Sequence, residues 1–276
     1  MFVPVLSDSA VVTLTAEMAF LWDKDGLLVH SEPHILATII EAAAAAVGAK
    51  RFSEAELQEI WKCFGKPDDE MSGLLFGVLA DLRYTLPVQR NEWVKYFVQQ
   101  RAMTWKQKLR LGVVKHKPGA LSCLKALQDE RVPLGMYTSM PQALVAMDLE
   151  HLFPEFDFYD VVTCSDTRLH GQGKPSPRGW QVLIDSLQNP RPGTHRFIAV
   201  EDRASGAVGA LEAGCELVVV VPDPSDVPRD AGPNDYLKLW DRRGFIQAWL
   251  ERNPGAENAS RLVFLPSLEV LRFKRG

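Results

Sequence analysis

Residues 18–26 read MAFLWDKDG, an apolar run that ends in two aspartates and a glycine. A short apolar run bounded by such a turn sequence is typical of a buried strand. The two aspartates, Asp23 and Asp25, then lie at the carboxyl end of the strand, which is the edge where open α/β sheets bind their ligands. The segment therefore predicts a buried strand over Met18–Trp22 with a polar site directly after it.

Short apolar runs alternate with helical stretches from about residue 118 onward, which is the pattern of a parallel sheet flanked by helices. Further strands are expected at Val132–Thr138, Asp160–Cys164, Phe197–Val200, Leu217–Val221 and Leu262–Phe264. Helices are expected at Pro118–Asp129, Pro141–Leu149, Pro177–Leu187 and Arg203–Ala213. We therefore expect an α/β fold with a Rossmann-like parallel sheet.

Residues 34–110 show helical patterns and no strand pattern. The patterns are the alanine-rich Ile35–Val47, a capping box of Ser53 and Glu56, and the periodic segments Met71–Leu82 and Trp93–Leu109. We expect a helical bundle, because about 80 residues far exceed what one crossover connection needs. Its core should hold Trp61, Trp93 and Trp105. The expected domains are an α/β core, 1–33 and 111–276, and a helical cap, 34–110.

Four prolines crowd into residues 222–233, ahead of a possible helix at Tyr236–Glu251. This pattern predicts a surface insertion in the core at about 222–258. The basic end of the chain, with Arg272, Lys274 and Arg275, is expected to be a solvated tail.

Composition excludes several classes of protein. Lys and Arg number 31 against 35 Asp and Glu, a net charge of −4, so a nucleic-acid binder that works through bulk positive charge is not expected. The longest apolar run, Ala42 to Val47, is far too short to cross a membrane. No basic residue precedes Lys24, and the four cysteines form no C-x-x-C pair, so we expect a cytoplasmic protein with reduced thiols.

Other polar residues follow the expected strands. Thr138 and Ser139 end one strand, Lys174 lies in Gly-Lys-Pro before a helix, and Glu201 and Asp202 end another strand. Paired carboxylates repel each other unless a cation lies between them, and a hard cation such as Mg²⁺ takes oxygen ligands. Each segment alone also fits an ordinary role, as a polar turn, a helix cap, a surface lysine or a solvated acidic loop.

Together and in this order, the segments resemble the haloacid dehalogenase superfamily of phosphatases and phosphomutases. The motifs are D-x-D-G-x-x-x-x-S-E-P at 23–33, the strand with Thr138, G-K-P-x-P at 173–177, and E-D-x-x-x-G with a later A-G at 201–214. The resemblance runs from about Phe20 to Gly214 and is to the beta-phosphoglucomutase-like and phosphatase branch, whose helical cap matches residues 34–110 in position. A weaker likeness at 262–268 matches the closing strand and helix of the family.

The resemblance implies a role for each matching residue. Asp23 would attack phosphorus and form an aspartyl-phosphate, and Asp25 would protonate the leaving oxygen and then activate water. Thr138 and Lys174 would hold the oxygens of the transferred group. Mg²⁺ would be held by Asp23, the backbone carbonyl of Asp25, Asp202 and Glu201, and the substrate contacts would be Lys66 in the cap loop 65–67, Ser139 and Gly26.

The sequence departs from the family pattern at supporting positions. Lys24 stands where an apolar residue is usual and, as the neighbour of both aspartates, is expected to point away from them. The other departures are Leu27, His30, Arg178 and Arg203. His30 and His34 are better placed for a hinge of the cap than for a metal site.

The leading function is a Mg²⁺-dependent phosphatase for a small phosphorylated metabolite, with no nucleic-acid or membrane partner and a monomer favoured. The alternatives are a sugar phosphomutase, which lacks its expected Arg-bearing cap segment here, and a non-catalytic protein that kept the fold. The second aspartate, Asp25, argues against a dehalogenase, because a halide leaving group needs no proton.

Overall fold

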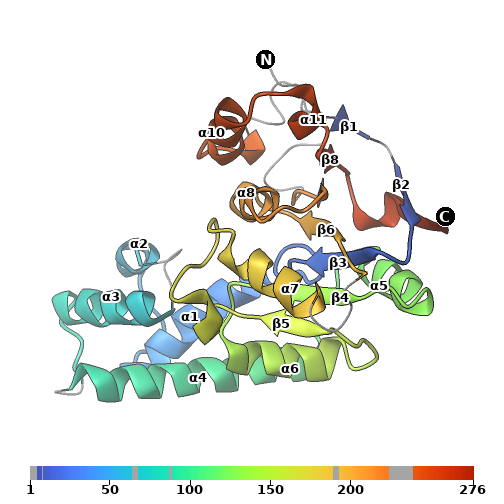
Figure 1. Cartoon of the computed structure of the whole chain (residues 1–276). Coiled ribbons are helices and arrows are strands. Elements are labelled where there is room, and N and C mark those ends of the chain that lie inside the picture. Colours follow the sequence, from blue (N-terminus) through green and yellow to red (C-terminus); the bar gives the residue numbers. More distant parts are fainter. Residues whose placement is uncertain (1–4, 8, 64–67, 87–88, 189–192, 224–238) are drawn as a thin grey trace. The chain divides into compact units, whose positions relative to one another are not determined.

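The computed structural model describes residues 5–7, 9–63, 68–86, 89–188, 193–223 and 239–276 (Figure 1). They divide into two compact units. The core unit comprises Met1–His30, His116–Met140 and Pro154–Gly276, and the helical unit comprises Ser31–Lys115 and Pro141–Phe153. Among the residues described, no helix is both long and apolar enough to cross a membrane.

The core unit is built on a seven-stranded sheet in the order β1-β8-β7-β6-β3-β4-β5, and every pairing in it is parallel. The strands are β1 (Val5–Leu6), β3 (Met18–Trp22), β4 (Leu134–Tyr137), β5 (Asp160–Val162), β6 (Arg196–Glu201), β7 (Leu217–Val220) and β8 (Leu262–Phe264). All five residues of β3 are buried, because β6 and β4 pair with its two edges and helices cover the sheet. The α/β fold expected from the sequence is confirmed.

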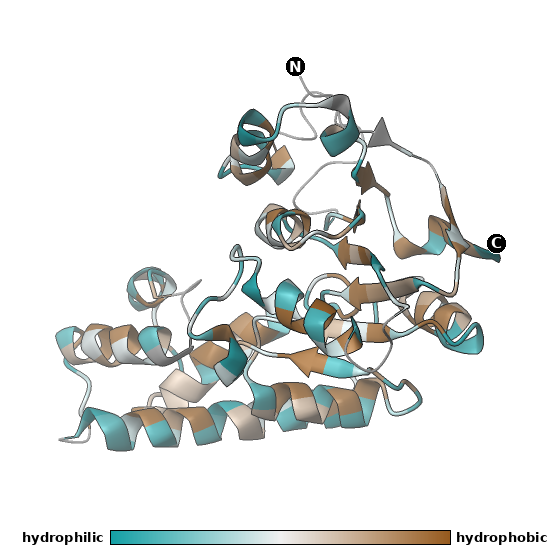
Figure 2. Ribbon diagram, viewed as in Figure 1, coloured by the Kyte–Doolittle hydropathy of each residue, from teal (hydrophilic) through white to brown (hydrophobic). Residues whose placement is uncertain are grey.

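The helices of the core unit are α5 (Ala120–Asp129), α7 (Arg178–Gln188), α8 (Ala204–Glu212), α10 (Phe245–Arg252) and the short α11 (Ala256–Ala259). Of these, α7 and α8 pack on the strands of the sheet, and α10 packs on α8. Figure 2 shows the central strands in hydrophobic colours, whereas the helices carry both kinds of residue. The expected helices therefore form within a few residues of their predicted ends.

Three short strands were not expected. These are β1, β2 (Ala10–Leu14) and β9 (Leu271–Arg275), and β2 pairs with β9 in a separate parallel ladder. The expectation of a solvated basic tail is therefore wrong for the backbone of residues 271–275. The side chains of Arg272, Lys274 and Arg275 are nevertheless exposed, so the charges lie in water while the main chain is paired.

The helical unit contains α1 (Glu32–Ala46), α2 (Glu54–Trp61), α3 (Asp68–Asp81), α4 (Arg90–Arg110) and α6 (Gln142–Leu152). The capping box of Ser53 and Glu56 is present at the start of α2. Trp93 and Trp105 are fully buried as expected, and Trp93 stacks on Phe97. Trp61 is 49% exposed, so its placement in the core was wrong, because it ends the short α2 on the solvent side.

The helix α6 was expected in the core but groups with the helical unit. It packs along α4, where the indole N–H of Trp105 donates to the buried carboxylate of Asp148 at 2.7 Å. A buried carboxylate needs such a donor, which ties α6 to α4. The helical unit also begins at Ser31 and ends its first segment at Lys115, a few residues outside the expected range of 34–110.

The described part of the proline-rich segment is not only a surface feature. The possible helix at 236–251 is observed as α10, and residues 224–238 lie outside the described residues. Trp240, Ile246 and Trp249 are buried in the apolar cluster of the core unit. This end of the segment therefore contributes to the core that supports the sheet.

Candidate active site

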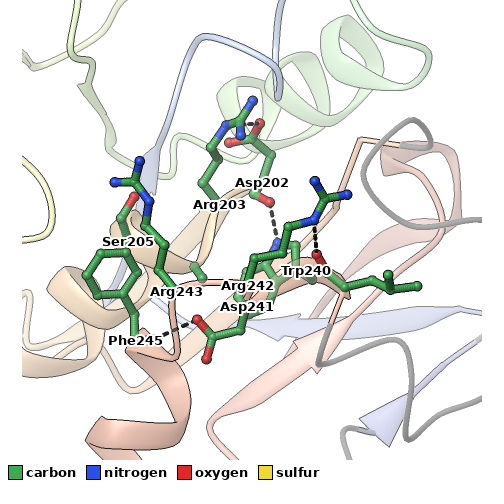
Figure 3. Close-up of a pocket in the computed structure, with 10 residues that line it drawn as sticks. Asp202, Arg203, Ser205, Trp240, Asp241, Arg242, Arg243 and Phe245 are labelled. Atoms are coloured by element: carbon green, nitrogen blue, oxygen red, sulfur yellow. Dashed lines mark hydrogen bonds and ion pairs between the residues drawn. The ribbon is translucent and has the colours of Figure 1, made fainter. Parts of the chain in front are cut away.

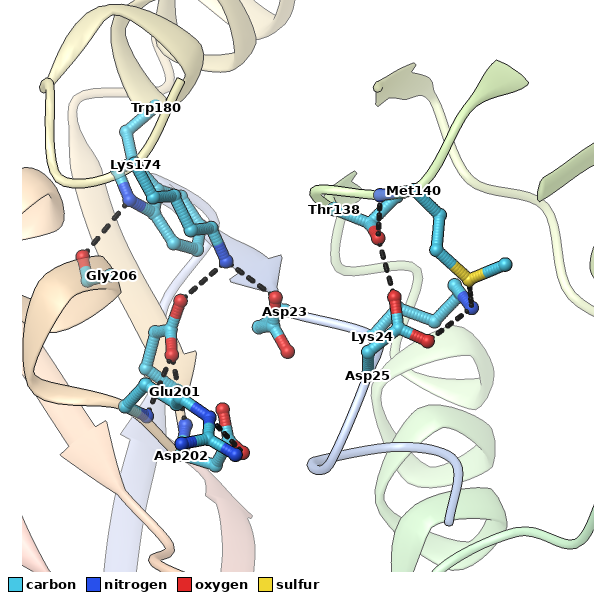
Figure 4. A network of polar contacts seen from close by, with 11 residues as sticks. Asp23, Lys24, Asp25, Thr138, Met140, Lys174, Trp180, Glu201, Asp202 and Gly206 are labelled. Atoms are coloured by element: carbon cyan, nitrogen blue, oxygen red, sulfur yellow. Dashed lines mark hydrogen bonds and ion pairs between the residues drawn. The ribbon is translucent and has the colours of Figure 1, made fainter. Parts of the chain in front are cut away.

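The predicted polar residues of the core unit converge because their strands are neighbours. Asp23 follows β3, Thr138 follows β4, and Asp202 follows β6, and these three parallel strands end at the same edge of the sheet. The amide of Asp23 donates to Val200 O at 2.9 Å, which extends the β3–β6 ladder and fixes the backbone of Asp23. Figure 4 shows two polar clusters at this edge, one around Asp23 and one around Asp25.

The cluster around Asp23 has the composition of a cation site. Asp23, Glu201 and Asp202 are all buried, and one carboxylate oxygen from each lies within 4.8 Å of the others. The Oδ2 atom of Asp23 is buried and has no hydrogen-bond partner among the described residues. A buried carboxylate oxygen without a donor is costly, and an oxygen-seeking divalent cation satisfies it. These residues therefore fit a divalent metal ion.

Lys174 supplies a positive charge to this cluster. Its Nζ donates to Asp23 Oδ1 and, at 2.5 Å, to Glu201 Oε1. The ammonium group also lies 4.9 Å from the ring centre of Tyr137 and 5.1 Å from that of Trp180. Burial alone would lower the pKa of Lys174, but the two carboxylates outweigh it and hold that pKa above its ordinary value. Lys174 is therefore a fixed cation.

Glu201 is held at both of its oxygens. Its Oε1 accepts from Lys174, and its Oε2 accepts the backbone N–H groups of Asp202 and Arg203, each at 3.0 Å. Gly206 of α8 lies directly against it, since a Cβ atom there would be 1.6 Å from Oε1. This contact gives the physical reason for the glycine in the E-D-x-x-x-G motif. Glu201 therefore orients the acidic loop and Lys174.

The protonation of Asp23 reflects its surroundings. Burial raises its pKa most, Lys174 opposes the rise, and repulsion from Glu201 and Asp25 adds to it, so that the pKa of Asp23 reaches about 8. The single positive charge of Lys174 does not balance the negative charges of Asp23, Glu201 and Asp25. A divalent cation beside Asp23 would favour its ionised form.

The second cluster surrounds the side chain of Asp25. The hydroxyl of Thr138 donates to Asp25 Oδ2 at 2.7 Å and accepts the backbone N–H of Met140 at 3.0 Å. The ammonium group of Lys24 lies 2.7 Å from Asp25 Oδ1 and 3.0 Å from Met140 Sδ. The expectation that Lys24 points away from its neighbours is therefore wrong, because the chain turns directly after β3 and strand alternation no longer applies.

The remaining expected residues are placed as follows. Gly26 has a φ of 87° and donates its N–H to Val29 O at 2.9 Å, so it closes the turn after the aspartates. Ser139 is exposed beside Thr138. Lys66 lies outside the described residues. The structure thus brings together Asp23, Asp25, Thr138, Lys174, Glu201 and Asp202, all of them in the core unit.

A pocket that the sequence did not predict borders Asp202 (Figure 3). It has a volume of about 280 Å³, and its polar lining includes Arg203, Arg242 and Arg243. The indole N–H of Trp240 donates to the backbone carbonyl of Asp202 at 2.5 Å, so the segment before α10 supports the acidic loop. A tryptophan in a proline-rich stretch gives no sequence pattern that points to this contact.

The other departures from the family pattern find partners of their own. The Nε of Arg178 donates to Arg168 O at 2.9 Å, and Arg203 Nε lies 3.9 Å from Asp202 Oδ2. Both arginines therefore stay outside the Lys174 contacts.

Comparison with known proteins places this sequence among hydrolases. The model of the haloacid dehalogenase-like hydrolase family matches residues 17–214. A "Probable pseudouridine-5'-phosphatase" of Saccharomyces cerevisiae is 30% identical over 220 residues, which cover 76% of this chain and 84% of that protein. A "Phosphorylated carbohydrates phosphatase" of Thermotoga maritima is 26% identical over 211 residues, which cover 72% of this chain and 83% of that protein.

Solved structures share the fold. A "putative beta-phosphoglucomutase from Thermotoga maritima" superposes with a TM-score of 0.58 at 21% identity, covering 91% of this chain and 95% of that one. CbbY from Rhodobacter sphaeroides, solved with phosphate, gives a TM-score of 0.55 at 18% identity, covering 75% and 86%. With the family match over 17–214, the chain belongs to the haloacid dehalogenase-like hydrolase family, in the branch that contains these phosphatases.

Proposed function

We propose that the protein is a Mg²⁺-dependent phosphomonoester hydrolase that acts on a small phosphorylated metabolite through an aspartyl-phosphate on Asp23. The observation that carries this proposal is the buried Oδ2 of Asp23, which lacks a hydrogen-bond partner among the described residues and lies in a cluster with Glu201 and Asp202. A carboxylate oxygen without a donor is available to a cation or to phosphorus.

The two clusters have different roles in the proposed reaction, nucleophilic attack at Asp23 and proton transfer at Asp25. Asp23 attacks phosphorus while Lys174, already bound to its Oδ1, offsets the negative charge that gathers as phosphate approaches. Asp25, in its separate cluster with Thr138, gives a proton to the leaving oxygen and later takes one from the attacking water. Hydrolysis returns Asp23 to its starting state and releases inorganic phosphate.

A bound Mg²⁺ would be held by Asp23, Asp202 and the backbone carbonyl of Asp25, and would neutralise phosphate oxygens. Glu201 would lie close to the ion and orient this set, since its oxygens accept from Lys174 and from two backbone N–H groups. The proposed contacts for the transferred oxygens are the exposed Ser139, Lys174 and Gly26. The hydroxyl of Thr138, which donates to Asp25, would join them by turning its proton from Asp25 to a phosphate oxygen. Lys66 is the proposed contact of the cap.

The relatives support a small substrate. Their names give pseudouridine 5'-phosphate and phosphorylated carbohydrates as substrates, both of which are phosphomonoesters of sugar-containing molecules. We propose the same chemical class for this protein.

Phosphate release from a panel of nucleoside and sugar phosphates, with MgCl₂ and with EDTA, tests the proposal. The matched variants are Asp23→Asn and Asp129→Asn, because Asp129 has a 60% exposed side chain far along α5. We expect Mg²⁺-dependent release by wild type and Asp129→Asn, and a loss of at least about 10³-fold for Asp23→Asn, the usual scale for removing a nucleophile. Equal activity of Asp23→Asn and wild type would show that Asp23 is not the nucleophile.

A further inference from the structure

Lys24 is a fully buried lysine between the two aspartates of the site. Burying an ammonium group costs several kcal/mol unless it is paired. Its ammonium group contacts Asp25 Oδ1 at 2.7 Å and Met140 Sδ at 3.0 Å. An apolar side chain would fill this buried position without that cost, so the charge itself needs an explanation.

The turn after β3 directs Lys24 toward Asp25. The backbone carbonyl of Lys24 accepts the N–H groups of Leu28 and Val29 at 3.0 and 3.1 Å, and Gly26 adopts a positive φ. The chain therefore reverses at Asp25, and the side chain of Lys24 lies on the same side as its neighbour's carboxylate. The contact follows from the backbone and does not depend on an exposed, mobile side chain.

The two oxygens of Asp25 are held by different elements. Lys24 holds Oδ1, and Thr138, at the end of β4, holds Oδ2 at 2.7 Å. Thr138 accepts the N–H of Met140, so its single hydroxyl proton is directed to Asp25, and the sulfur of Met140 contacts Lys24. These contacts form a closed ring that fixes the rotation of the Asp25 carboxylate (Figure 4).

We propose that Lys24 is the positioning residue of Asp25: its ammonium group holds Oδ1 so that the carboxyl group stays aligned for proton exchange with the leaving oxygen and with water. The proposal rests on the proposed phosphatase function. An error of about 1 Å in the position of a reacting group can cost about 10²-fold in rate, which sets the scale of the expected effect.

The test compares two substrates whose leaving groups differ. An alkyl phosphate needs a proton from Asp25 when its ester bond breaks, whereas p-nitrophenyl phosphate releases a stable phenolate without one. The variant Lys24→Met keeps the length of the side chain and removes the charge. In single turnovers with Mg²⁺, we expect its rate on glycerol phosphate to fall about 10²-fold, and its rate of p-nitrophenolate release to fall at least about 10-fold less, with KM for both within a few-fold of wild type.

A purely structural role for Lys24 predicts a different result. Damage to the whole site lowers both rates by the same factor, and that outcome would overturn the proposal. Lys24→Gln keeps a hydrogen-bond donor without the charge, so it should recover part of the alkyl-phosphate rate. If Lys24→Met does not fold, the same comparison is made with Lys24→Gln. A larger loss on glycerol phosphate than on p-nitrophenyl phosphate supports the proposal, and equal losses overturn it.

A thermal double-mutant cycle separates this proposal from the proposed function. If wild type releases no phosphate from either substrate, the function fails, while the contact between Lys24 and Asp25 is still measured by the unfolding temperatures of Lys24→Met, Asp25→Asn and the double variant. Groups in contact give non-additive shifts. Shifts that add within about 1 °C would show that Lys24 does not hold Asp25, because independent sites are the ones whose effects add.

Discussion

A substitution at Gly206 tests the packing of the acidic loop, Glu201 and Asp202, on α8, because Glu201 leaves no room for a side chain at Gly206. In Gly206→Ala, the new Cβ would lie 1.6 Å from Glu201 Oε1 and 2.1 Å from its Cδ. Non-bonded heavy atoms keep about 3.5 Å apart, so the carboxylate would have to retreat by about 2 Å. Glu201 is only 1% exposed and cannot move into water.

The retreat of Glu201 breaks identifiable contacts. They are the bond from Lys174 and the two backbone bonds from Asp202 and Arg203. Hydrogen bonds to a charged group contribute about 1.5–3 kcal/mol each, and overpacking a core costs about 1–3 kcal/mol. Because these effects overlap, we expect a net loss of roughly 3 kcal/mol. For a chain of this size, that lowers Tm by about 6–12 °C.

The assay is thermal unfolding in EDTA with a second glycine as control. Gly77 lies inside α3, and a Cβ atom there meets nothing within 4 Å. Gly77→Ala should therefore raise the free energy of unfolding by about 0.5–1 kcal/mol, the helix preference of alanine over glycine. We therefore expect the same glycine-to-alanine change to lower the free energy of unfolding at Gly206 and to raise it at Gly77. A Tm of Gly206→Ala equal to or above that of wild type would refute the packing of Glu201 on α8.

Four further outcomes are expected. The pKa of Asp23 is about 8 in the folded state, above its ordinary 3.8, so the folded state binds this proton more tightly than the unfolded state does. Proton binding by Asp23 therefore stabilises the fold at low pH, and this stabilisation is lost as the pH rises toward 8. Tm in EDTA should thus fall between pH 5 and about 8, and the fall should be smaller in Asp23→Asn; parallel pH curves would contradict this. MgCl₂ at 100 times Kd should raise the free energy of unfolding of wild type by about 2.7 kcal/mol. A titration of Tm with MgCl₂ measures this stabilisation, which we expect to be absent in Asp202→Asn and present in Asp129→Asn. Trp93→Ala should cost about 3–5 kcal/mol in urea unfolding, since its side chain is fully buried. Trp61→Ala, at an exposed position, should stay within about 0.5 kcal/mol, and comparable losses for both tryptophans would contradict the observed burial.

Much of the candidate site could be predicted because it depends on strand ends. An apolar run that stops at a charged residue marks the end of a buried strand, and in a parallel sheet such ends meet at one edge. Asp23, Thr138 and Asp202 follow this rule, so residues more than a hundred positions apart in the chain lie in one site.

The features that were missed depend on contacts that leave no local pattern. The strands β2 and β9 pair with each other from segments that are far apart in the sequence, so no neighbouring segment indicates their pairing. The direction of Lys24 follows from the turn after β3, which overrides strand alternation. Trp240 reaches Asp202 from a segment far along the chain, and the contact depends on tertiary packing alone.

The pairing of segments that are far apart in the sequence bears on how the core unit is made. Within the described residues, β1 pairs only with β8 and β2 only with β9, so these strands cannot pair until residues 262–275 have been synthesised. Synthesis delivers residues from the N-terminus, and contacts between distant segments form slowly. The nascent chain therefore holds two strands without these partners until residues 262–275 have been synthesised, and unpaired strand edges are where chains associate with one another. A stop codon before residue 262 would leave Asp23, Lys174 and Asp202 present in a chain that lacks the partners of β1, β2 and β7.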